Sequence, residues 1–312
     1  MGAGSVIDAL PVEVDDACLR GWPLPQPDAD GDKEERGRVL VIAGSREMPG
    51  ALILAAKAAL NAGAGKLTVA TAASVAKLVA TALPEARVIE LAETDAGGID
   101  RNAVERVREL LSQVDAVLIG PGMQDEPAVC DFCAQLLDHL ATCALVLDAA
   151  AMGVVLDSAL KVEKFSGATI MTPHAGELAH LTGDEKEKIS AQPAPAAASA
   201  ARRWNAVVAL KGATTFVAGP DGSLWRHARG NVGLAISGSG DVLAGLIAGV
   251  ASRGASAEQA AVWGVALHAR AGEQLAARSG PLGYLARDLS AEVPALMGAF
   301  ALPSYRARAR KR

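Results

Sequence analysis

The amino-acid sequence predicts an α/β fold in which a mostly parallel sheet is covered by helices on both faces. Short runs of branched apolar residues, such as 39–42, alternate along the chain with Ala- and Leu-rich stretches of helical length. This alternation is typical of parallel sheets, whose strands are buried on both faces and are therefore apolar throughout. Hydrophobic residues make up 51% of the 312 residues and charged residues 21%, which excludes a disordered chain.

In the first half of the chain, strands and helices are predicted in strict alternation. Runs rich in Val, Ile and Leu predict strands at 38–43, 66–70, 88–91, 116–119 and 144–147. The stretches between them predict helices at 51–62, 74–83, 102–112 and 128–140. Pro49-Gly50 precede the first helix and Gly63-Ala64-Gly65 follow it, as expected for residues that begin and end helices.

The second half adds strands and then becomes largely helical. Apolar runs predict strands at 169–171 and 207–210, and Pro220-Asp221-Gly222 predict a hairpin between 215–218 and 224–227. Long apolar periodic stretches predict helices at 241–252, 257–277 and 284–298. The Ala-rich segment 192–201, which contains two prolines, is compatible with a linker, but we expect a loop that leads into a helix.

We expect one domain, flanked by two segments of different character. Residues 1–36 are polar, with three prolines and an acidic cluster, and predict an irregular arm. Residues 37–300 show no shift in composition and predict a single domain. Residues 301–312 form a basic tail, and such an end is most often a solvated terminus.

Composition and charge exclude several classes of function. The net charge of −5 and the 3% of aromatic residues argue against nucleic acid as a partner. No run of 18 apolar residues is present, so we expect no membrane span. The first thirty residues lack a basic stretch followed by an apolar one, so no secretory signal is predicted and the cytoplasm is the expected compartment.

Glycine and polar residues follow the predicted strands, where ligands bind in open α/β sheets. The most informative segment is Gly238-Ser239-Gly240-Asp241, which precedes an apolar helix. Small residues allow close approach of a ligand, helix N–H groups attract an anion, and a carboxylate there can act as a base. The alternative is a plain glycine-rich turn in which Asp241 is the N-cap. No G-x-x-x-x-G-K-[ST] motif is present, which argues against a Walker-type nucleotide hydrolase.

Several further motifs make the chain resemble the ADP/ATP-dependent NAD(P)H-hydrate dehydratases, a family of the ribokinase-like superfamily. The likeness runs from about residue 37 to about residue 297. Its carriers are glycine-rich turns and strand ends: 43–45, 49–51, 63–65, 120–122, 172–177, 210–215, 230–233 and 238–243. Gly-x-Gly-Asp alone indicates only the superfamily. Thr172-Pro-His-Ala-Gly-Glu177 together with Gly63-Ala-Gly65 indicate the dehydratase branch.

The resemblance implies a three-layer ribokinase-like fold and a cofactor-repair reaction. Members of the family remove water from the S epimer of hydrated NADH or NADPH, with ADP or ATP as co-substrate and Mg²⁺ as cofactor. Phosphorylation of the hydroxyl would turn it into a good leaving group, and the ring nitrogen would then help to expel it. The resemblance also implies a separate epimerase in the pathway, and close packing of Ala-rich helices suggests a homo-oligomer.

The resemblance also implies roles for individual residues. Asp241 matches the catalytic base, and Gly238, Ser239 and Gly240 match an anion hole for the transferring phosphoryl group. Positions matching the hydrate-binding site are Ala51, Gly122, His174 and Asp241. Positions matching the nucleotide-binding site are Lys211, Gly212, Ala213, Thr214, Thr215 and Gly240. Glu177 falls where relatives order Mg²⁺ through water. Asn231 is expected to shape the same pocket.

The chain departs from the family pattern at four places on the substrate side. Met48 replaces an aromatic residue, Ala150 replaces the second carboxylate of Asp-x-Asp, and Val232 and Leu234 replace the usual Pro and Met. Two alternatives stay open, and the missing carboxylate at Ala150 is the main support for the first of them. One is a small-molecule kinase of the same superfamily that acts on a sugar, thiazole or pyrimidine alcohol. The other is a protein that binds adenine nucleotide without turning it over.

Overall fold

A ten-stranded sheet runs through the molecule, in the spatial order β1-β10-β9-β8-β7-β6-β5-β2-β3-β4. The computed structural model of the chain describes residues 10–27 and 33–300. The strands are β1 (Val12–Glu13), β2 (Arg38–Ile42), β3 (Lys66–Ala72), β4 (Arg87–Leu91), β5 (Ala116–Ile119), β6 (Ala144–Leu147), β7 (Ala168–Met171), β8 (Val207–Leu210), β9 (Thr215–Ala218) and β10 (Leu224–His227). Every neighbouring pair is parallel except those that β9 makes with β8 and β10, so the predicted mostly parallel sheet is confirmed.

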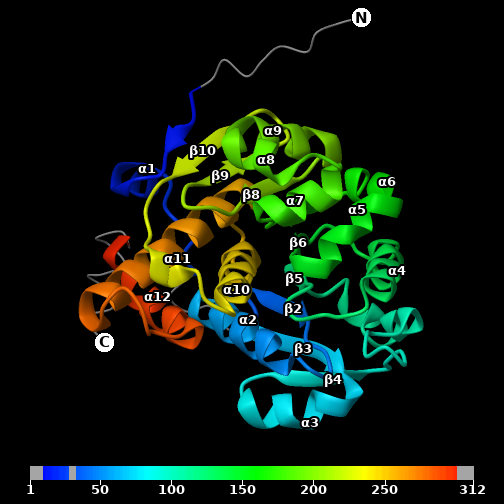
Figure 1. The fold of residues 1–312 in the computed structure, drawn as a ribbon. Helices are drawn as coiled ribbons and strands as arrows, with labels where there is room; N and C mark the ends of the chain where they lie inside the picture. Colours follow the sequence, from blue (N-terminus) through cyan, green and yellow to red (C-terminus); the bar gives the residue numbers. More distant parts are fainter. Residues whose placement is uncertain (1–9, 28–32, 301–312) are drawn as a thin grey trace, which may run out of the picture.

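One layer of helices covers one face of the sheet, and Figure 1 shows the three yellow to red helices and the blue α2 on the same side. The helices of this layer are α2 (Pro49–Asn61), α3 (Ala73–Ala82), α10 (Ser239–Ser252), α11 (Ala257–Ser279) and α12 (Ala286–Phe300). Alternate strand residues such as Val39 and Val41 pack against them, while Leu40 and Ile42 point to the opposite core. The two cores explain why the central strands are apolar at every position.

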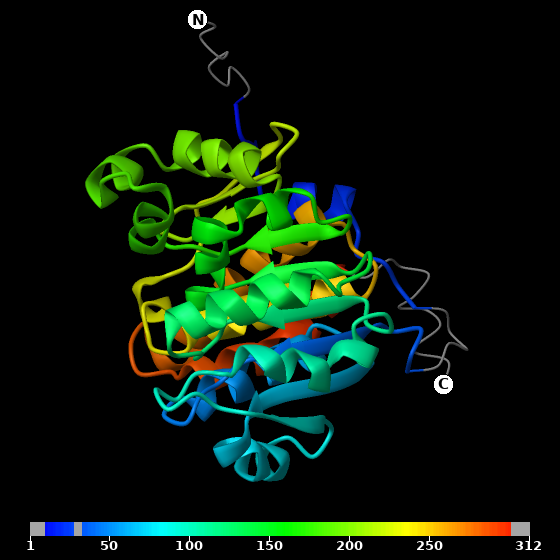
Figure 2. The same cartoon turned by 90° about the vertical axis from the view of Figure 1, so that its right-hand side faces the viewer.

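Shorter helices and 3₁₀ segments cover the opposite face, mostly green in Figures 1 and 2. The α-helices are α4 (Glu126–Leu137), α5 (Val154–Asp157), α6 (Ala159–Glu163), α7 (Ala175–Thr182), α8 (Lys186–Ala191) and α9 (Pro193–Trp204). The 3₁₀ segments are η1 (Arg101–Arg106), η2 (Arg108–Leu110) and η3 (Ala149–Gly153); a fourth, η4 (Val232–Leu234), precedes α10. A layer of helices on each face confirms the predicted three-layer architecture.

The helices α10 and α2 pack in close contact, and glycine makes this contact possible. A methyl group on Gly245 would overlap the carbonyl oxygen of Ala55, and one on Gly249 would overlap that of Ala59. The two helix backbones therefore approach more closely than larger side chains would allow. This contact holds α10 against α2, so that the first turns of both helices lie at the same edge of the sheet.

Two predicted elements differ in the structure. The segment 102–112 was predicted as an α-helix, but it forms the 3₁₀ segments η1 and η2, with i→i+3 bonds such as Val107 N–H to the carbonyl of Val104. The segment 192–201 was predicted as a loop that leads into a helix, but residues 193–201 already belong to α9, which begins at Pro193. Its two prolines lie in the first turn, where a helix needs no N–H donors, so they begin the helix instead of breaking it.

The prediction that residues 1–36 form an irregular arm is wrong for the segment around 12–21. It contains β1, which pairs with β10, and the helix α1 (Asp16–Gly21). Contacts with residues far along the chain stabilise it: Trp263 Nε1 and Gln259 Nε2 donate to the carbonyl of Trp22 at 2.8 and 3.1 Å. A local pattern cannot reveal such partners. The predicted basic tail at 301–312 lies outside the described residues. In the described ranges, no helix has the length and apolarity needed to cross a membrane.

Candidate active site

The carboxyl ends of the central strands meet at one edge of the sheet and bring together the segments that the sequence singles out. Because β2, β5, β6, β7 and β8 are parallel, the residues that follow them lie on the same edge. These are Gly44–Ser45, Gly120–Gly122, Asp148, Thr172–His174 and Lys211. The start of α10 faces this edge, since α10 packs on β5 and β6. This edge is the candidate active site.

Gly238 caps α10 and shapes its first turn. Its φ of 88° is in the left-handed region that favours glycine, and a methyl group there would lie 2.5 Å from Cδ1 of Leu54. The N–H groups of Gly240 and Asp241 find no acceptor in the described part of the chain. Two unpaired donors at a helix N-terminus can bind an anion such as a phosphoryl group.

Asp241 lies in the first turn of α10 but does not cap it. Gly238 is the N-cap, and no side chain caps the helix, so the alternative of an Asp241 N-cap is wrong. Burial, and then the negative charge of Asp148, raise the pKa of Asp241 to about 6, while Lys211 opposes this shift. The side chain of Asp241 makes no hydrogen bond or ion pair within the described residues, and a carboxylate with such a raised pKa is suited to accept a proton near neutral pH.

Lys211 is the positive centre of the edge. Its Nζ atom lies 3.3 Å from Oδ1 of Asp148 and 3.5 Å from Oε2 of Glu177. A methyl group on Gly240 would lie 3.6 Å from the same Nζ, so the ammonium group is next to the first turn of α10. Burial by itself would lower the pKa of Lys211, but the two carboxylates outweigh it and raise that pKa. Lys211 is therefore protonated, beside the two free N–H groups.

Asp148 is the residue of this edge that sequence reasoning left without a role. Its side chain is only 4% exposed, and its Oδ1 accepts a 2.6 Å hydrogen bond from Oγ1 of Thr172. The sequence did contain a sign of this role. Asp148 directly follows an apolar strand, and burying a carboxylate there is costly unless it has partners. The structure supplies those partners from β7 and β8, which no local pattern specifies.

His174 and Glu177 begin α7 as a reciprocal cap. Nδ1 of His174 accepts hydrogen bonds from the N–H groups of Gly176 and Glu177 at 3.0 and 3.1 Å, and Oε2 of Glu177 accepts one from the N–H of His174 at 2.7 Å. With Nδ1 acting as an acceptor, the ring proton of a neutral His174 is on Nε2. The side chain is 56% exposed, so Nε2 can reach a ligand at the edge.

Ala51 and Gly122 form a second part of the edge, on the α2 side. A methyl group on Gly122 would lie 2.5 Å from Cβ of Ala51 and 2.8 Å from the carbonyl oxygen of Met48, and the φ of Gly122 is 66°. Ala51 lies one helical turn before Leu54, which contacts Gly238. The structure therefore brings Ala51 and Gly122 together, and α2 connects them with the start of α10. Met48, one of the departures from the family pattern, is 42% exposed beside them.

The segment Lys211–Thr215 connects β8 to β9 at the same edge. The N–H of Lys211 donates to the carbonyl of Pro173 at 2.7 Å, and Lys211 pairs with His174 in a β-bridge. Gly212 and Ala213 are exposed, and Thr214 and Thr215 are half-buried. Thr215 begins β9, where it pairs with His227 of β10. The segment therefore offers exposed backbone groups at the edge of the sheet where the candidate active site lies.

Asn231 supports the loop that precedes α10. Its Oδ1 accepts hydrogen bonds from the N–H of Gly233 and from the hydroxyl of Tyr284, both at 2.8 Å. Of the two departures in this loop, Val232 is 67% exposed, whereas Leu234 packs against Gly272 of α11. Asn231 therefore ties the loop to the segment before α12.

The described residues contain no group of three or more His, Cys, Asp or Glu side chains arranged to hold a metal ion. Asp148 and Glu177 both face Lys211 instead. This donor set fits Mg²⁺ only in the manner usual with nucleotides, where phosphates and water supply most of the ligands and the protein adds one or two carboxylates.

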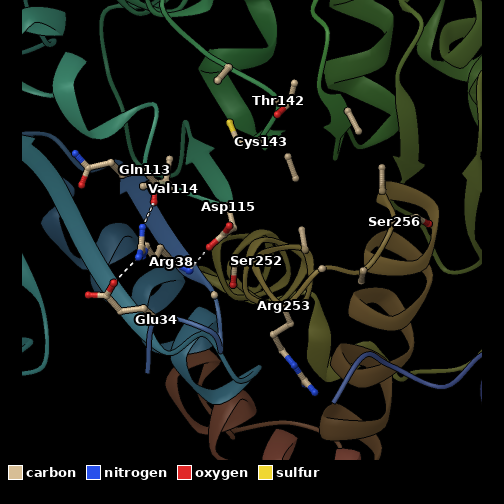
Figure 3. A pocket seen from close by; sticks show the side chains of 18 of the residues that line it. Glu34, Arg38, Gln113, Val114, Asp115, Thr142, Cys143, Ser252, Arg253 and Ser256 are labelled. Carbon is tan, nitrogen blue, oxygen red and sulfur yellow. Dashed lines mark hydrogen bonds and ion pairs between the residues drawn. The ribbon is translucent and has the colours of Figure 1, made fainter. Parts of the chain in front are cut away.

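A cavity of about 800 Å³ lies at the opposite edge of the sheet, where β2, β5, β6 and β7 begin (Figure 3). Arg38 lies in the wall of this cavity. The Arg38 guanidinium donates to the carbonyl of Gln113 at 3.2 Å and contacts Glu34, and the Arg38 backbone N–H donates to the carboxylate of Asp115 at 2.7 Å. These groups are paired with one another, and none of the residues singled out by the sequence lines the cavity. It is not the candidate active site.

The strand order and the helices on both faces define the class of fold: the chain has a ribokinase-like α/β fold, and a ribokinase-like superfamily protein of Enterococcus faecalis superimposes with a TM-score of 0.79 at 24% identity. A family model described as NAD(P)H-hydrate dehydratase matches residues 39–295. The chain belongs to this family. It is 50% identical over 281 residues to the ADP-dependent (S)-NAD(P)H-hydrate dehydratase of Xanthomonas campestris, covering 90% of this chain and 94% of that protein.

Two further comparisons agree. The chain is 41% identical over 266 residues to the bifunctional NAD(P)H-hydrate repair enzyme Nnr of Moorella thermoacetica; the match covers 85% of this chain but only 50% of that protein. The crystal structure of the ADP/ATP-dependent NAD(P)H-hydrate dehydratase of Bacillus subtilis, co-crystallised with ATP and Mg²⁺, superimposes with a TM-score of 0.79 at 30% identity. It covers 94% of this chain and 100% of that one.

Proposed function

We propose that this protein is a nucleotide-dependent dehydratase that restores NADH and NADPH from the S epimer of their hydrates. Membership of the family and the match to a dehydratase along nearly its whole length support the proposal. The structural observation that carries it is the start of α10, where Asp241, two free N–H groups and the ammonium of Lys211 lie together. This combination is suited to transferring a phosphoryl group to a hydroxyl.

The reaction needs that transfer because hydroxide is a poor leaving group. Asp241 accepts the proton of the substrate hydroxyl as its oxygen attacks the terminal phosphoryl group of the nucleotide. The bond to the remaining nucleotide breaks, and the substrate carries a phosphate in place of its hydroxyl. The lone pair of the ring nitrogen then helps to expel inorganic phosphate, and loss of a ring proton restores the double bond of the reduced nicotinamide.

The remaining residues divide between the two substrates. In this proposal the backbone of Gly238, Ser239 and Gly240 binds the phosphoryl group in transfer. The nucleotide lies along Lys211, Gly212, Ala213, Thr214 and Thr215. The hydrate lies against Ala51, Gly122 and His174, where the exposed Nε2–H of His174 is a donor for a substrate oxygen.

ADP or ATP is the proposed phosphoryl donor, together with Mg²⁺. Relatives are named as ADP-dependent, and a structural neighbour was crystallised with ATP and Mg²⁺. When bound, Mg²⁺ would neutralise charge on the phosphates. Glu177 would hold it through water, since its carboxylate already accepts the N–H of His174 and faces Lys211.

We further propose a homo-oligomer in the cytoplasm that works with a separate epimerase. The epimerase would convert the R hydrate into the S form. Support for a separate epimerase comes from the Xanthomonas relative, which is named as a dehydratase only and matches this chain over 94% of its own length. Sedimentation velocity of the purified protein would test the assembly: a single species at the monomer mass would contradict it.

The first experiment follows the absorbance band of reduced nicotinamide. Purified protein is mixed with hydrated NADH and Mg²⁺, with ADP, with ATP or without nucleotide. We expect the band to return only with nucleotide, and the more effective nucleotide identifies the donor. No recovery, beside an active control dehydratase, would overturn the proposal. A stable phosphorylated product from a screen of small alcohols would then favour the kinase alternative, for which Met48 and Ala150 are the supporting observations.

A further inference from the structure

The side chain of His268, on α11, makes a hydrogen bond to Ser239, the first residue of α10. Its Nε2 lies 2.9 Å from Oγ of Ser239. Ser239 is the first residue of α10 and is 6% exposed, so its hydroxyl is enclosed by protein and faces the imidazole. None of the roles assigned above uses His268.

The neighbouring contacts show why this hydrogen bond matters for the geometry of the turn. On the α2 side, Gly238 rests on Leu54, and a methyl group there would also lie 3.1 Å from Cβ of Ala286. On the other side, the N–H of Ser239 donates to the carbonyl of Ile236 at 3.2 Å. The side-chain contact with His268 fixes Ser239 from α11. The next two residues are Gly240 and Asp241, whose N–H groups find no acceptor in residues 10–27 and 33–300.

The imidazole does this without adding charge. Desolvation by the surrounding protein lowers the pKa of His268 to about 4; the positive charge of Lys211 acts in the same direction, and the backbone of Ser239 opposes the shift. At neutral pH the ring is therefore uncharged, and the positive charge beside the turn remains that of Lys211.

We propose that His268 is a positioning residue for phosphoryl transfer, which holds Ser239 so that the N–H groups of Gly240 and Asp241 face the phosphoryl group in transfer. The inference rests on the proposed function. Donors fixed in advance stabilise the transition state more than the bound nucleotide, because negative charge develops where they point. The effect of His268 therefore belongs to kcat and much less to nucleotide binding.

Four variants test this in the full-length protein: His268→Leu, His268→Gln, Ser239→Ala and the double variant His268→Leu/Ser239→Ala. The rate of the first turnover is measured with protein in excess over hydrated NADH, and ADP and ATP binding by calorimetry. We expect His268→Leu and Ser239→Ala each to lower the single-turnover rate about tenfold, as loss of one positioning hydrogen bond predicts, with the nucleotide Kd changed less than about threefold. His268→Gln, whose amide can reach the same hydroxyl, restores most of the rate.

The double variant separates positioning from a general structural role. If His268 acts through Ser239, the double variant is no slower than Ser239→Ala alone. Ser252→Ala is the matched control, because Ser252 is a buried serine in the last turn of the same helix, where its Oγ donates to the carbonyl of Gly249 at 2.9 Å. We expect it to leave the single-turnover rate unchanged.

Three results would overturn the inference. They are an unchanged rate in Ser239→Ala, additive losses in the double variant, or equal losses in kcat and nucleotide affinity. Ser239→Ala removes only one oxygen, so it decides the question even if His268→Leu does not fold. An inactive wild-type protein would instead contradict the proposed function, which keeps the two failures distinct.

Discussion

At the scale of single residues, three carboxylates share the charge of one lysine. Asp148 and Glu177 form ion pairs with Lys211. The charges of both Asp148 and Lys211 shift the pKa of Asp241. Burial raises the pKa of Asp241 most strongly, and the negative charge of Asp148 raises it further. The pKa of Asp241 therefore depends first on its burial and then on the charge of Asp148, a residue at the end of β6. The contribution of Asp148 has measurable consequences.

The first consequence is a pH dependence of activity. Since Asp241 must be ionised to accept a proton, we expect kcat/KM to rise with pH through a midpoint near 6. Asp148→Asn removes the negative charge that adds to the effect of burial on the pKa of Asp241. The midpoint of the kcat/KM profile of this variant should therefore move to lower pH. Thr172→Val, which removes the hydrogen bond to Asp148 but no charge, should leave the midpoint in place. An acid limb that does not move in Asp148→Asn would contradict this account.

The second consequence concerns Asp241 itself. We expect Asp241→Asn to lower turnover at least about a hundredfold while nucleotide binding is retained. The folded-state pKa of Asp241 is raised, so its favourable contribution to stability is complete below pH 3.8 and is lost as the pH rises through about 6. Asp241→Asn should therefore raise Tm at pH 8, and the difference from wild type should vanish near pH 4. Equal activity of variant and wild type would favour a non-catalytic nucleotide-binding protein.

At the scale of elements, the site depends on how closely α10 packs on α2. The apolar run 242–250 predicts a helix, but the role of its glycines is visible only when α2 is beside it. Gly245 and Gly249 face the backbone of α2 at Ala55 and Ala59. Glycine lowers helix propensity by about 1 kcal/mol relative to alanine, so these positions exchange local helix stability for close approach.

Replacing Gly245 tests that exchange. Gly245→Ala improves helix propensity but places a methyl group against the carbonyl of Ala55. Overpacking costs about 1–3 kcal/mol, which exceeds the propensity gain, so we expect a lower free energy of unfolding in urea. Gly21→Ala, in α1 with no atom within 4 Å of the added methyl group, is the control and should not destabilise the protein. A stabilised Gly245→Ala would show that the two helices can separate freely.

Elements were also where sequence-based prediction succeeded and failed most clearly. The buried strands were predicted because β2, β5 and β6 are apolar at nearly every position, which few other environments produce. The start of α9 was placed too late because Pro193 and Pro195 suggest a loop, whereas prolines in the first turn are compatible with a helix. Proline is therefore compatible with the first turn of a helix but breaks or kinks its interior.

At the scale of the whole molecule, the N-terminal segment closes one end of the sheet. The β1 strand pairs with β10, and Trp22 stacks on Trp225 with ring centroids 5.7 Å apart. Arg270 of α11, which is 8% exposed, donates to Asp16 at 2.6 Å. These contacts connect α1, β10 and α11, three elements widely separated along the chain.

We expect the segment to contribute to stability more than to catalysis. Trp22→Ala removes the ring stack and should lower the free energy of unfolding by about 2 kcal/mol, with kcat at 25 °C unchanged, because its contacts are with β10 and α11 away from the start of α10. Leu10→Ala, at a side chain that is 91% exposed, is the control and should change neither. Thermal unfolding and the absorbance assay measure the two effects, and a loss of kcat alone would contradict this division of roles.

The sequence by itself determined the fold class and the position of the chemistry along the chain. Apolar runs and helical stretches specified a parallel sheet, and the motif at 238–241 specified where an anion could bind, because these depend on neighbouring residues. The tertiary structure decided which side chains share charge. Asp148 and Lys211 follow β6 and β8, Glu177 lies in the first turn of α7, and His268 reaches Ser239 from another helix. Such contacts depend on strand order and helix packing, and the protonation of Asp241 depends on them in turn.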